Sequence, residues 1–230
     1  MKRIPHQRFR NSGTIAAILP ALVLAACAGD SDLAQVTNLL FHYATGSNEK
    51  VTRDRAAAVP FATMGLEFGS TPQVLFILGA AREDQLEWYS GDQAFLATSH
   101  GRVVRTAGFP YDLGGFHALP ANSINAGPAA GANPAPRLFA LDYPDLGVFG
   151  ATAQCSSRNA GDATVEILGT RISTIHVIEH CTVPALKWTF DNEFWQDRMS
   201  GYVWRSSQHI HPKSPPIVLE VLRPEQSGPG

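Results

Sequence analysis

The clearest hairpin in this chain runs Ala163-Thr-Val-Glu-Ile-Leu168, then Gly169-Thr170, then Arg171-Ile-Ser-Thr-Ile-His-Val-Ile178. Both flanking runs are rich in β-branched residues, which favour strands. A two-residue connection containing glycine is typical of a hairpin turn. The segment therefore predicts two antiparallel strands, with Leu168 paired to Arg171.

Strand-like runs continue on both sides of this hairpin at a spacing of roughly ten residues. They are Phe61–Phe68, Gln73–Leu78, Leu86–Ser90, Ala94–Thr98, Arg102–Thr106, Arg137–Leu141, Gly147–Gln154, Leu186–Phe190, Glu193–Gln196, Tyr202–Ile210 and Ile217–Leu222. Repeated short strands with turn residues between them indicate an antiparallel meander. We predict an all-β fold, either a sandwich or a half-barrel.

Two segments depart from the strand pattern. Apolar residues at helical spacing follow Ser31, a good N-cap, and the pattern stops at Gly46, so one short N-terminal α-helix is expected. Residues 108–136 hold five prolines and several glycines, which predicts a long loop, flexible near 121–136 where Ala, Gly and Pro dominate.

Composition narrows the class of protein. The chain has 230 residues, of which 17% are charged, and a formal net charge of −2. This length fits one domain with a substantial core. A chain without basic excess has little to neutralise phosphates, so no nucleic-acid partner is expected.

The N-terminus has the pattern of a secretory signal. Four basic residues precede an apolar run from Thr14 to Ala26, which is too short to span a membrane. The run ends Leu24-Ala-Ala-Cys27, which resembles the bacterial lipobox. The resemblance implies a signal peptide over 1–26 and a single lipoprotein domain over 27–230.

The lipobox resemblance further implies that Cys27 carries a thioether diacylglycerol and an N-acyl chain, which together anchor a protein stably. Ala28 in place of Asp implies the outer membrane of a Gram-negative bacterium, facing the periplasm. The alternative is an ordinary signal peptide with a chance cysteine. Loss of residues 1–26, with their four basic and no acidic residues, changes the net charge to −6.

Cys155 and Cys181 are the remaining cysteines. In the periplasm disulfides form and persist. The predicted hairpin register places Cys181 opposite Arg158, three residues from Cys155, and a bulge or loop would close this gap. We predict a disulfide, with two reduced buried thiols as the alternative. The two cysteines do not have the CxxC spacing that would indicate a metal site.

Two further stretches resemble a known family. Leu96–Leu113 contains Thr106-Ala-Gly-Phe-Pro-Tyr-Asp-Leu113, similar to that family's "TxGxxxDL" turn, and Gly201–Pro224 matches its "G-x-V-W-x-S-x-Q-x-x-x-P" strand pair. Together with the lipobox, they resemble the YjbF/GfcB lipoproteins associated with group 4 capsule and exopolysaccharide production. The resemblance implies a role beside polysaccharide-secretion components and no established catalytic residues.

Within the second motif, Trp204, Gln208 and His209 are candidates for contact with a polysaccharide or a partner protein. A structural role explains Trp204 and Gln208 equally well, because a tryptophan buries a large apolar surface and a glutamine can satisfy backbone groups. The sequence therefore leaves these residues with two explanations.

Catalytic chemistry has weaker support. The pairs His176/His180 and His209/His211 each share one strand face in the predicted pattern, and either Glu179 or Asp197 is available as a partner. There is no GxSxG or HExxH motif. We predict a non-enzymatic protein without a metal or other cofactor. The alternatives are a metal-dependent or hydrolytic glycan-modifying enzyme and a carrier of a hydrophobic ligand.

Overall fold

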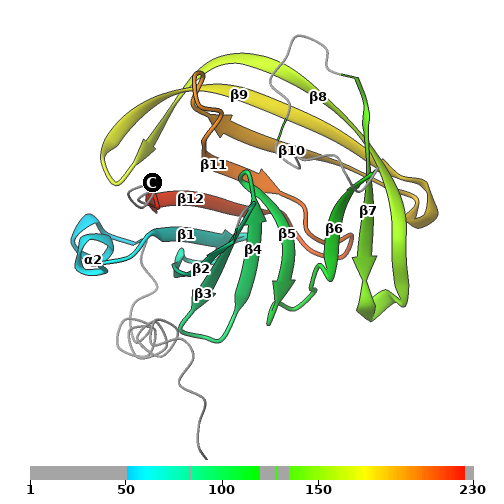
Figure 1. The fold of residues 1–230 in the computed structure, drawn as a ribbon, viewed down its shortest axis with the longest axis horizontal. Coiled ribbons are helices and arrows are strands. Elements are labelled where there is room, and N and C mark those ends of the chain that lie inside the picture. The colour runs from blue at the N-terminus through cyan, green and yellow to red at the C-terminus, as the bar shows by residue number, and fades with distance from the viewer. Residues whose placement is uncertain (1–50, 83, 120–127, 129–134, 226–230) are drawn as a thin grey trace, which may run out of the picture.

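A computed structural model describes residues 51–82, 84–119, 128 and 135–225. They form one twelve-stranded antiparallel sheet that curls into a nearly closed barrel, with one short helix, α2 (Arg53–Ala58) (Figure 1). The strands are β1 (Thr63–Phe68), β2 (Val74–Arg82), β3 (Gln85–Ser90), β4 (Phe95–Ser99), β5 (Arg102–Ala107), β6 (Gly115–Leu119), β7 (Arg137–Tyr143), β8 (Val148–Ile167), β9 (Thr170–Val183), β10 (Trp188–Gln196), β11 (Val203–Gln208) and β12 (Ile217–Arg223). Two 3₁₀ turns, η1 (Pro144–Leu146) and η2 (Pro184–Leu186), connect β7 to β8 and β9 to β10.

The predicted all-β antiparallel fold with a short N-terminal helix is confirmed. Of the predicted architectures, the half-barrel comes closer than the sandwich. Neighbouring strands in the sheet are neighbours in the chain, except that β12 pairs with β1. The helix predicted from Ser31 to Gly46, and most of the loop near 121–136, lie outside the described residues.

A turn held by side-chain hydrogen bonds connects β5 and β6, the two edge strands of the sheet, and keeps them close together. The Asp112 carboxylate accepts hydrogen bonds from the Thr106 hydroxyl (2.9 Å) and from the backbone N–H of Gly108 and Phe109. The Thr106 backbone N–H also donates to the Leu113 carbonyl at 2.9 Å, and the Leu113 N–H donates to the Thr106 hydroxyl at 2.8 Å. This turn is the TxGxxxDL segment, and it nearly closes the barrel.

The hairpin of β8 and β9 has a different register from the predicted one. Ile167 pairs with Thr170, so the turn residues are Leu168 and Gly169, both at positive φ. A bulge between Asn159 and Gly161 shifts the register once more. The bulge anticipated from the sequence is therefore present.

Two other sequence predictions were wrong. β6 lies inside the segment 108–136, which was predicted to be all loop. β10 is one continuous strand, whereas Asp191-Asn192 was predicted to be a turn between two strands. Asn192 is instead buried, and its side-chain oxygen accepts from the backbone N–H of His209 at 2.8 Å.

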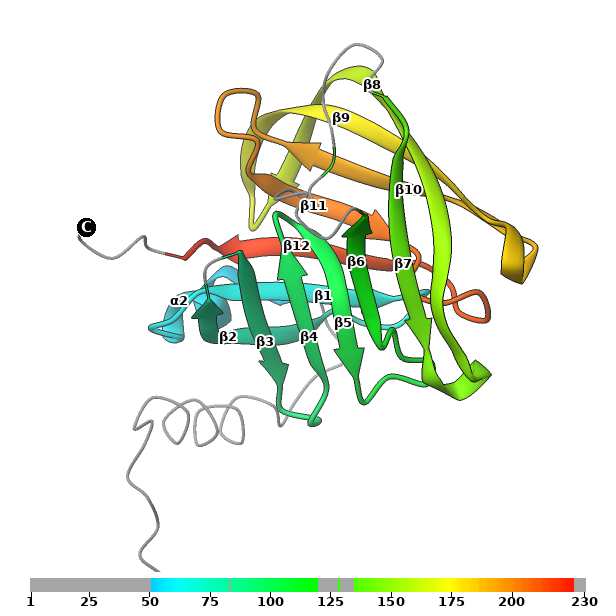
Figure 2. The same ribbon diagram turned by 45° about the vertical axis from the view of Figure 1, so that its right-hand side comes forward.

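Helix α2 packs on the outside of the sheet. Thr52 caps it by accepting from the Arg55 N–H at 3.3 Å, and Ala56 and Val59 pack against β2. The β8–β9 hairpin arches across one end of the barrel (Figures 1 and 2). Its turn reaches this helix, where Arg53 donates to the carbonyl of Leu168. Among the described residues, no helix has the length and apolarity needed to cross a bilayer.

Candidate functional site

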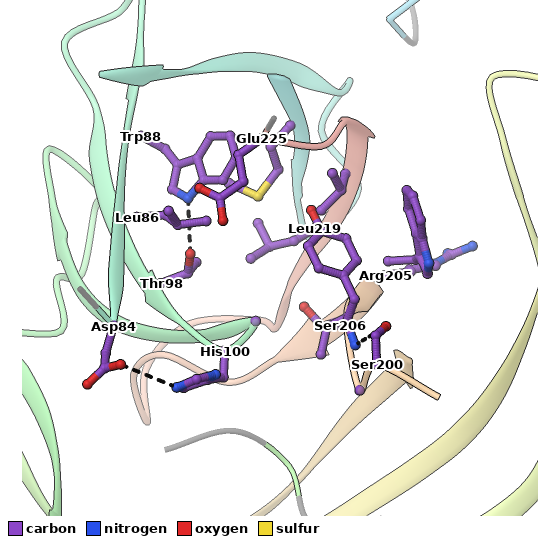
Figure 3. Close-up of a pocket in the computed structure, with 17 residues that line it drawn as sticks. Asp84, Leu86, Trp88, Thr98, His100, Ser200, Arg205, Ser206, Leu219 and Glu225 are labelled. Carbon is purple, nitrogen blue, oxygen red and sulfur yellow. Dashed lines mark hydrogen bonds and ion pairs between the residues drawn. The ribbon is translucent and has the colours of Figure 1, made fainter. Parts of the chain in front are cut away.

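A pocket of about 300 Å³ opens at one end of the barrel (Figure 3). Its lining comes from β1, β3 and β4 on one side and from β11 and β12 on the other. These elements are distant in sequence but lie close together because β12 pairs with β1. Its volume is at the lower end of the range for small-molecule sites.

The pocket walls are apolar and aromatic. Figure 3 shows Leu86 and Trp88 facing Leu219 across the pocket. Tyr202 and Trp204 meet edge to face, with ring centroids 5.0 Å apart. The Trp88 indole N–H donates to Thr98 at 3.0 Å, and this side chain is only 2% exposed, so it forms a buried part of the wall. The remaining apolar lining residues are Met64, Val203 and Val221.

Polar side chains also line the pocket. Asp84 and Glu225 contribute carboxylates, and His100 Nε2 lies 3.9 Å from Asp84 Oδ1. Burial, followed by the negative charge of Glu225, raises the pKa of Tyr202 above that of free tyrosine. Among the described residues, the Tyr202 hydroxyl has no hydrogen-bond partner. It therefore remains a neutral hydroxyl next to a carboxylate.

The turn between β4 and β5 borders the pocket and is held by Gln208. The Gln208 amide donates to the Gly101 carbonyl at 2.9 Å, and its oxygen accepts from the Val103 N–H at 3.0 Å. A Cβ on Gly101, which has φ +80°, would lie 2.4 Å from a side-chain carbon of Val203. Close packing of backbone against β11 therefore fixes the position of His100.

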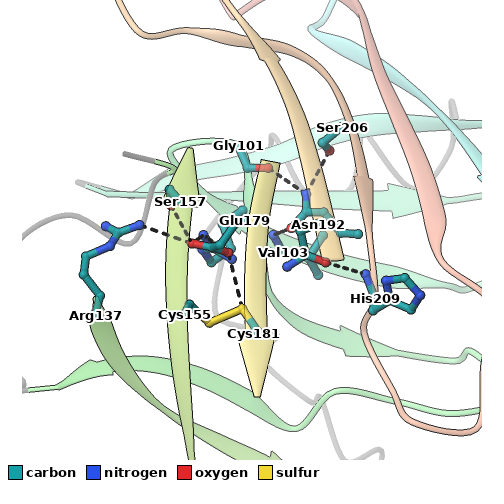
Figure 4. Close-up of polar contacts among 12 residues, drawn as sticks. Gly101, Val103, Arg137, Cys155, Ser157, Glu179, Cys181, Asn192, Ser206 and His209 are labelled. Atoms are coloured by element: carbon teal, nitrogen blue, oxygen red, sulfur yellow. Dashed lines mark hydrogen bonds and ion pairs between the residues drawn. A yellow bond between two sulfur atoms is a disulfide. The ribbon is translucent and has the colours of Figure 1, made fainter. Parts of the chain in front are cut away.

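Beside this turn, the barrel interior contains a buried ion cluster (Figure 4). Arg102 donates to Glu179 at 2.7 Å, and these side chains are only 1% and 0% exposed. Arg137 lies 3.4 Å from the same carboxylate. Burial, followed by the positive charge of Arg102, lowers the pKa of Arg137. The Arg102 guanidinium also lies over the ring of Phe116, at 4.8 Å from its centroid.

Cys155 and Cys181 pair directly across β8 and β9 and are joined by a disulfide next to Glu179 (Figure 4). The predicted register, with Cys181 opposite Arg158, was wrong because of the different turn and the bulge. Both cysteines face the barrel interior and are nearly inaccessible.

Comparison with known proteins supplies the family. The family model described as "Group 4 capsule polysaccharide lipoprotein gfcB, YjbF" matches residues 32–222. The chain belongs to this family.

Relatives agree with this assignment along almost the whole chain. The uncharacterized lipoprotein YjbF of Escherichia coli K12 is 26% identical over 217 residues, which cover 90% of this chain and 96% of the relative. The uncharacterized lipoprotein GfcB of the same organism is 23% identical, with 89% and 95% covered. The names of the family and of these relatives associate the family with lipoproteins and with capsule polysaccharide.

The crystal structure of the hypothetical lipoprotein YmcC from Escherichia coli K12 has the same fold. The TM-score is 0.66 at 22% identity, covering 86% of this chain and 99% of the other. At this identity the likeness shows the fold alone.

The segments that resemble YjbF/GfcB motifs have structural roles at the pocket. Val203, Ser206 and Gln208 hold the β4–β5 turn, and the Gln208 amide also donates to the Ser206 hydroxyl at 2.8 Å. The TxGxxxDL segment closes the barrel after the same hairpin. The family motifs thus surround the hairpin that borders the pocket.

The three predicted contact residues do not form one site. Trp204 lines the pocket, whereas Gln208 is buried in the framework. His209 packs against Phe190, and its Nδ1 lies 3.0 Å from the carbonyl oxygen of Asp191. Cys27 lies outside the described residues, so its lipidation stays a prediction.

The four histidines of the metal hypothesis do not converge. His176 and His180 lie on the outer face of β9, 2.8 Å from Glu193 and 2.7 Å from Asp191 respectively. His211 is fully buried, stacked on a tyrosine and 3.1 Å from Asp145. Each imidazole already has a neighbouring carboxylate or carbonyl oxygen.

Both suggested carboxylate partners were wrong. Glu179 points to the barrel interior, away from the β9 histidines, because side chains alternate along a strand. Asp197 instead caps the β10–β11 turn, where it accepts from the N–H of Met199 and Ser200.

A partial Ser-His-Asp arrangement crosses the outer face. Ser156, His180 and Asp191 are register partners on β8, β9 and β10. The His180 and Asp191 side chains are 59% and 60% exposed. Within the described chain no hydrogen bond joins Ser156 to His180, so the nucleophile–base contact that activates a serine is missing.

Cys155, Glu179 and Cys181 also offer ligand atoms of the kind that bind metals, all within 4.8 Å of one another. The two sulfurs are bonded to each other, and the Glu179 carboxylate already forms ion pairs with Arg102 and Arg137. The donor set therefore does not fit a cation.

Sequence reasoning did not identify the polar groups of the pocket: Asp84, His100, Tyr202 and Glu225. Asp84 and His100 lie in turns, Tyr202 directly precedes β11, and Glu225 lies two residues after β12. The only available signal was the Ser99-His100-Gly101 turn, which was predicted as a connection between strands.

Proposed function

We propose that this protein is an outer-membrane-anchored periplasmic lipoprotein that supports export or assembly of a capsule or exopolysaccharide. Its role is binding or scaffolding beside secretion components, without catalysis. The observation that carries the proposal is the match of residues 32–222 to the capsule-lipoprotein family, directly after a lipobox-like segment.

Anchoring follows from the N-terminal segment. Cleavage after Ala26 exposes Cys27, and each methylene of an attached acyl chain adds about 0.8 kcal/mol of membrane affinity. Several chains on one residue make the attachment stable.

A binding role without catalysis is favoured by the site itself. The pocket combines aromatic walls with a few polar groups, which is typical of ligand sites. The outer-face Ser-His-Asp arrangement lacks the serine–histidine contact among the described residues. A soluble assay on acetylated or glycosidic model substrates tests this claim, and turnover abolished by His180→Ala would contradict it.

Deletion of the gene tests the proposed role in polysaccharide export or assembly. Surface and secreted polysaccharide are measured in the deletion strain under producing conditions and after complementation. We expect output to fall and to recover with the wild-type gene. Unchanged output in the deletion strain would refute the role in polysaccharide production.

The Cys27→Ser variant tests the anchor in the same strain. We expect it to leave the outer-membrane fraction and to restore output poorly. Ala28→Ser, which leaves Cys27 intact, is the control and should fractionate as wild type. If Cys27→Ser still fractionates with the outer membrane, the anchor assignment is wrong.

A further inference from the structure

We infer that the pocket at the end of the barrel binds an uncharged, hydroxyl-rich sugar unit and rejects anionic ones. The inference rests on the proposed function and narrows it to one site and one class of ligand. It is carried by three properties of the lining: aromatic surface, hydrogen-bonding groups suited to hydroxyls, and the sign of the charge.

The aromatic surface suits a sugar ring. Pyranose rings present faces of C–H groups, which pack on aromatic side chains. Trp204 and Tyr202 line the pocket and are partly exposed, whereas Trp88, only 2% exposed, is buried in its wall. Neither remaining tryptophan is available in this way: Trp195 is stacked on His176 at 4.6 Å, and Trp188 is stacked on Phe190 at 4.0 Å.

The polar groups suit hydroxyls. Ionised carboxylates accept hydrogen bonds only, and sugar hydroxyls donate them. Asp84 and Glu225 both reach the pocket, and the Asp84 side chain is 58% exposed. Tyr202 adds a neutral hydroxyl that both donates and accepts. A hydroxyl–carboxylate bond is roughly twice as strong as one between neutral groups.

The charge excludes anions. Among the described residues that line the pocket, Arg205 is the only lysine or arginine, and its Nη1 already lies 3.5 Å from Glu220. Its guanidinium also lies over the ring of Trp195, a residue that does not line the pocket. A uronic acid, a phosphosugar or an anionic lipid headgroup would therefore meet two carboxylates, because the Arg205 guanidinium already faces Glu220 and the His100 imidazole lies 3.9 Å from Asp84. Like charges of this kind build specificity against the wrong ligand.

The same lining argues against an acyl chain. Met64, Leu86 and Leu219 would accept one, but an acyl chain makes no use of Asp84 and Glu225. Desolvating these carboxylates beside a hydrocarbon, without a hydrogen bond in return, would cost free energy.

The test uses the producing bacterium's own polysaccharide. Fragments from partial acid hydrolysis are separated by ion exchange into uncharged, anionic and amine-bearing fractions. Each is titrated into the purified mature domain while tryptophan fluorescence is followed. We expect the uncharged fraction to change the fluorescence saturably and the anionic fraction to bind at least roughly tenfold more weakly.

Matched variants assign the signal to the pocket. The double variant Asp84→Asn with Glu225→Gln keeps side-chain shape and removes both charges. It should weaken binding of the uncharged fraction roughly tenfold and strengthen binding of the anionic fraction. Asp92→Asn, on the exposed β3–β4 turn, is the control and should bind both fractions as wild type does. The reversal of preference is a result that mere loss of folding cannot produce.

Three results would overturn the inference: no fraction binds, the anionic or amine-bearing fraction binds most tightly, or the double variant binds like wild type. The double variant also goes into the deletion strain. Full recovery of polysaccharide output there would refute the pocket's role while leaving the proposed function standing. A deletion strain with normal output would instead refute the proposed function.

Discussion

Replacing Glu179 with glutamine should destabilise the barrel more than any isosteric acid-to-amide change on its surface. The carboxylate is fully buried, with Arg102 at 2.7 Å and Arg137 at 3.4 Å. Ser157 lies 3.5 Å away from it. Glutamine keeps the shape, but it removes the charge that the buried Arg102 and the partly exposed Arg137 face, and it replaces one acceptor oxygen with an NH2 donor.

The magnitude follows from the burial. Removing one partner of a buried ion pair costs about 3–5 kcal/mol, because the remaining charge stays desolvated and uncompensated. This is a large share of the ~5–15 kcal/mol that stabilises a typical domain. With a urea dependence of about 1–3 kcal/mol per molar, the unfolding midpoint should fall by at least about 1 M.

Urea unfolding followed by tryptophan fluorescence measures the effect. Glu193→Gln is the matched control: that side chain is 40% exposed and pairs with His176 at 2.8 Å, so its loss should cost about 0–1 kcal/mol. If Glu179→Gln and Glu193→Gln shift the midpoint equally, the interior cluster does not stabilise the barrel as argued.

Three further changes test other parts of the structure. Gly101→Ala should cost about 1–3 kcal/mol more than Gly147→Ala in urea unfolding, because both glycines have positive φ but only Gly101 packs against Val203; equal costs would contradict the packing argument. Cys181→Ala opens a disulfide with a sequence separation of 26 and should cost roughly 3–4 kcal/mol, whereas a stability insensitive to reductant would argue against the bridge. The raised pKa of Tyr202 means that its contribution to stability is complete below the unfolded pKa of ~10 and is lost as pH rises through the folded value. Tyr202→Phe should therefore lessen the loss of stability between about pH 9 and about pH 11, and an unchanged pH profile would count against it.

The local elements of the fold could be predicted because their signals are local. Runs of β-branched residues and a glycine turn identified the β8–β9 hairpin, and short predicted turns separated β3, β4 and β5. The errors occurred where tertiary contacts override local signals. Asp191-Asn192 has turn composition, yet Asn192 is buried in β10 and bonded to the His209 backbone.

The barrel and its pocket depend on contacts that no local pattern contains. A meander predicts neighbouring pairs, but the pairing of β12 with β1 decides between an open sheet and a barrel. The pocket needs Asp84 and Glu225 at the same end of that barrel. Likewise, the contact of Glu179 with Arg102 joins two strands that are distant in the sequence, so no local pattern indicates it.

The β1–β12 pairing has a consequence for how the chain folds. Thr63 pairs with Arg223, so the last strand must find a partner 160 residues earlier. Contacts of such large sequence separation slow folding, because chain entropy is lost before they form. Hairpins such as β8–β9 can form early, whereas the wall between β1 and β12 forms only when the final strand arrives. Until then both strands expose unpaired edges that invite aggregation, and this makes the interval before barrel closure the vulnerable stage of its biogenesis.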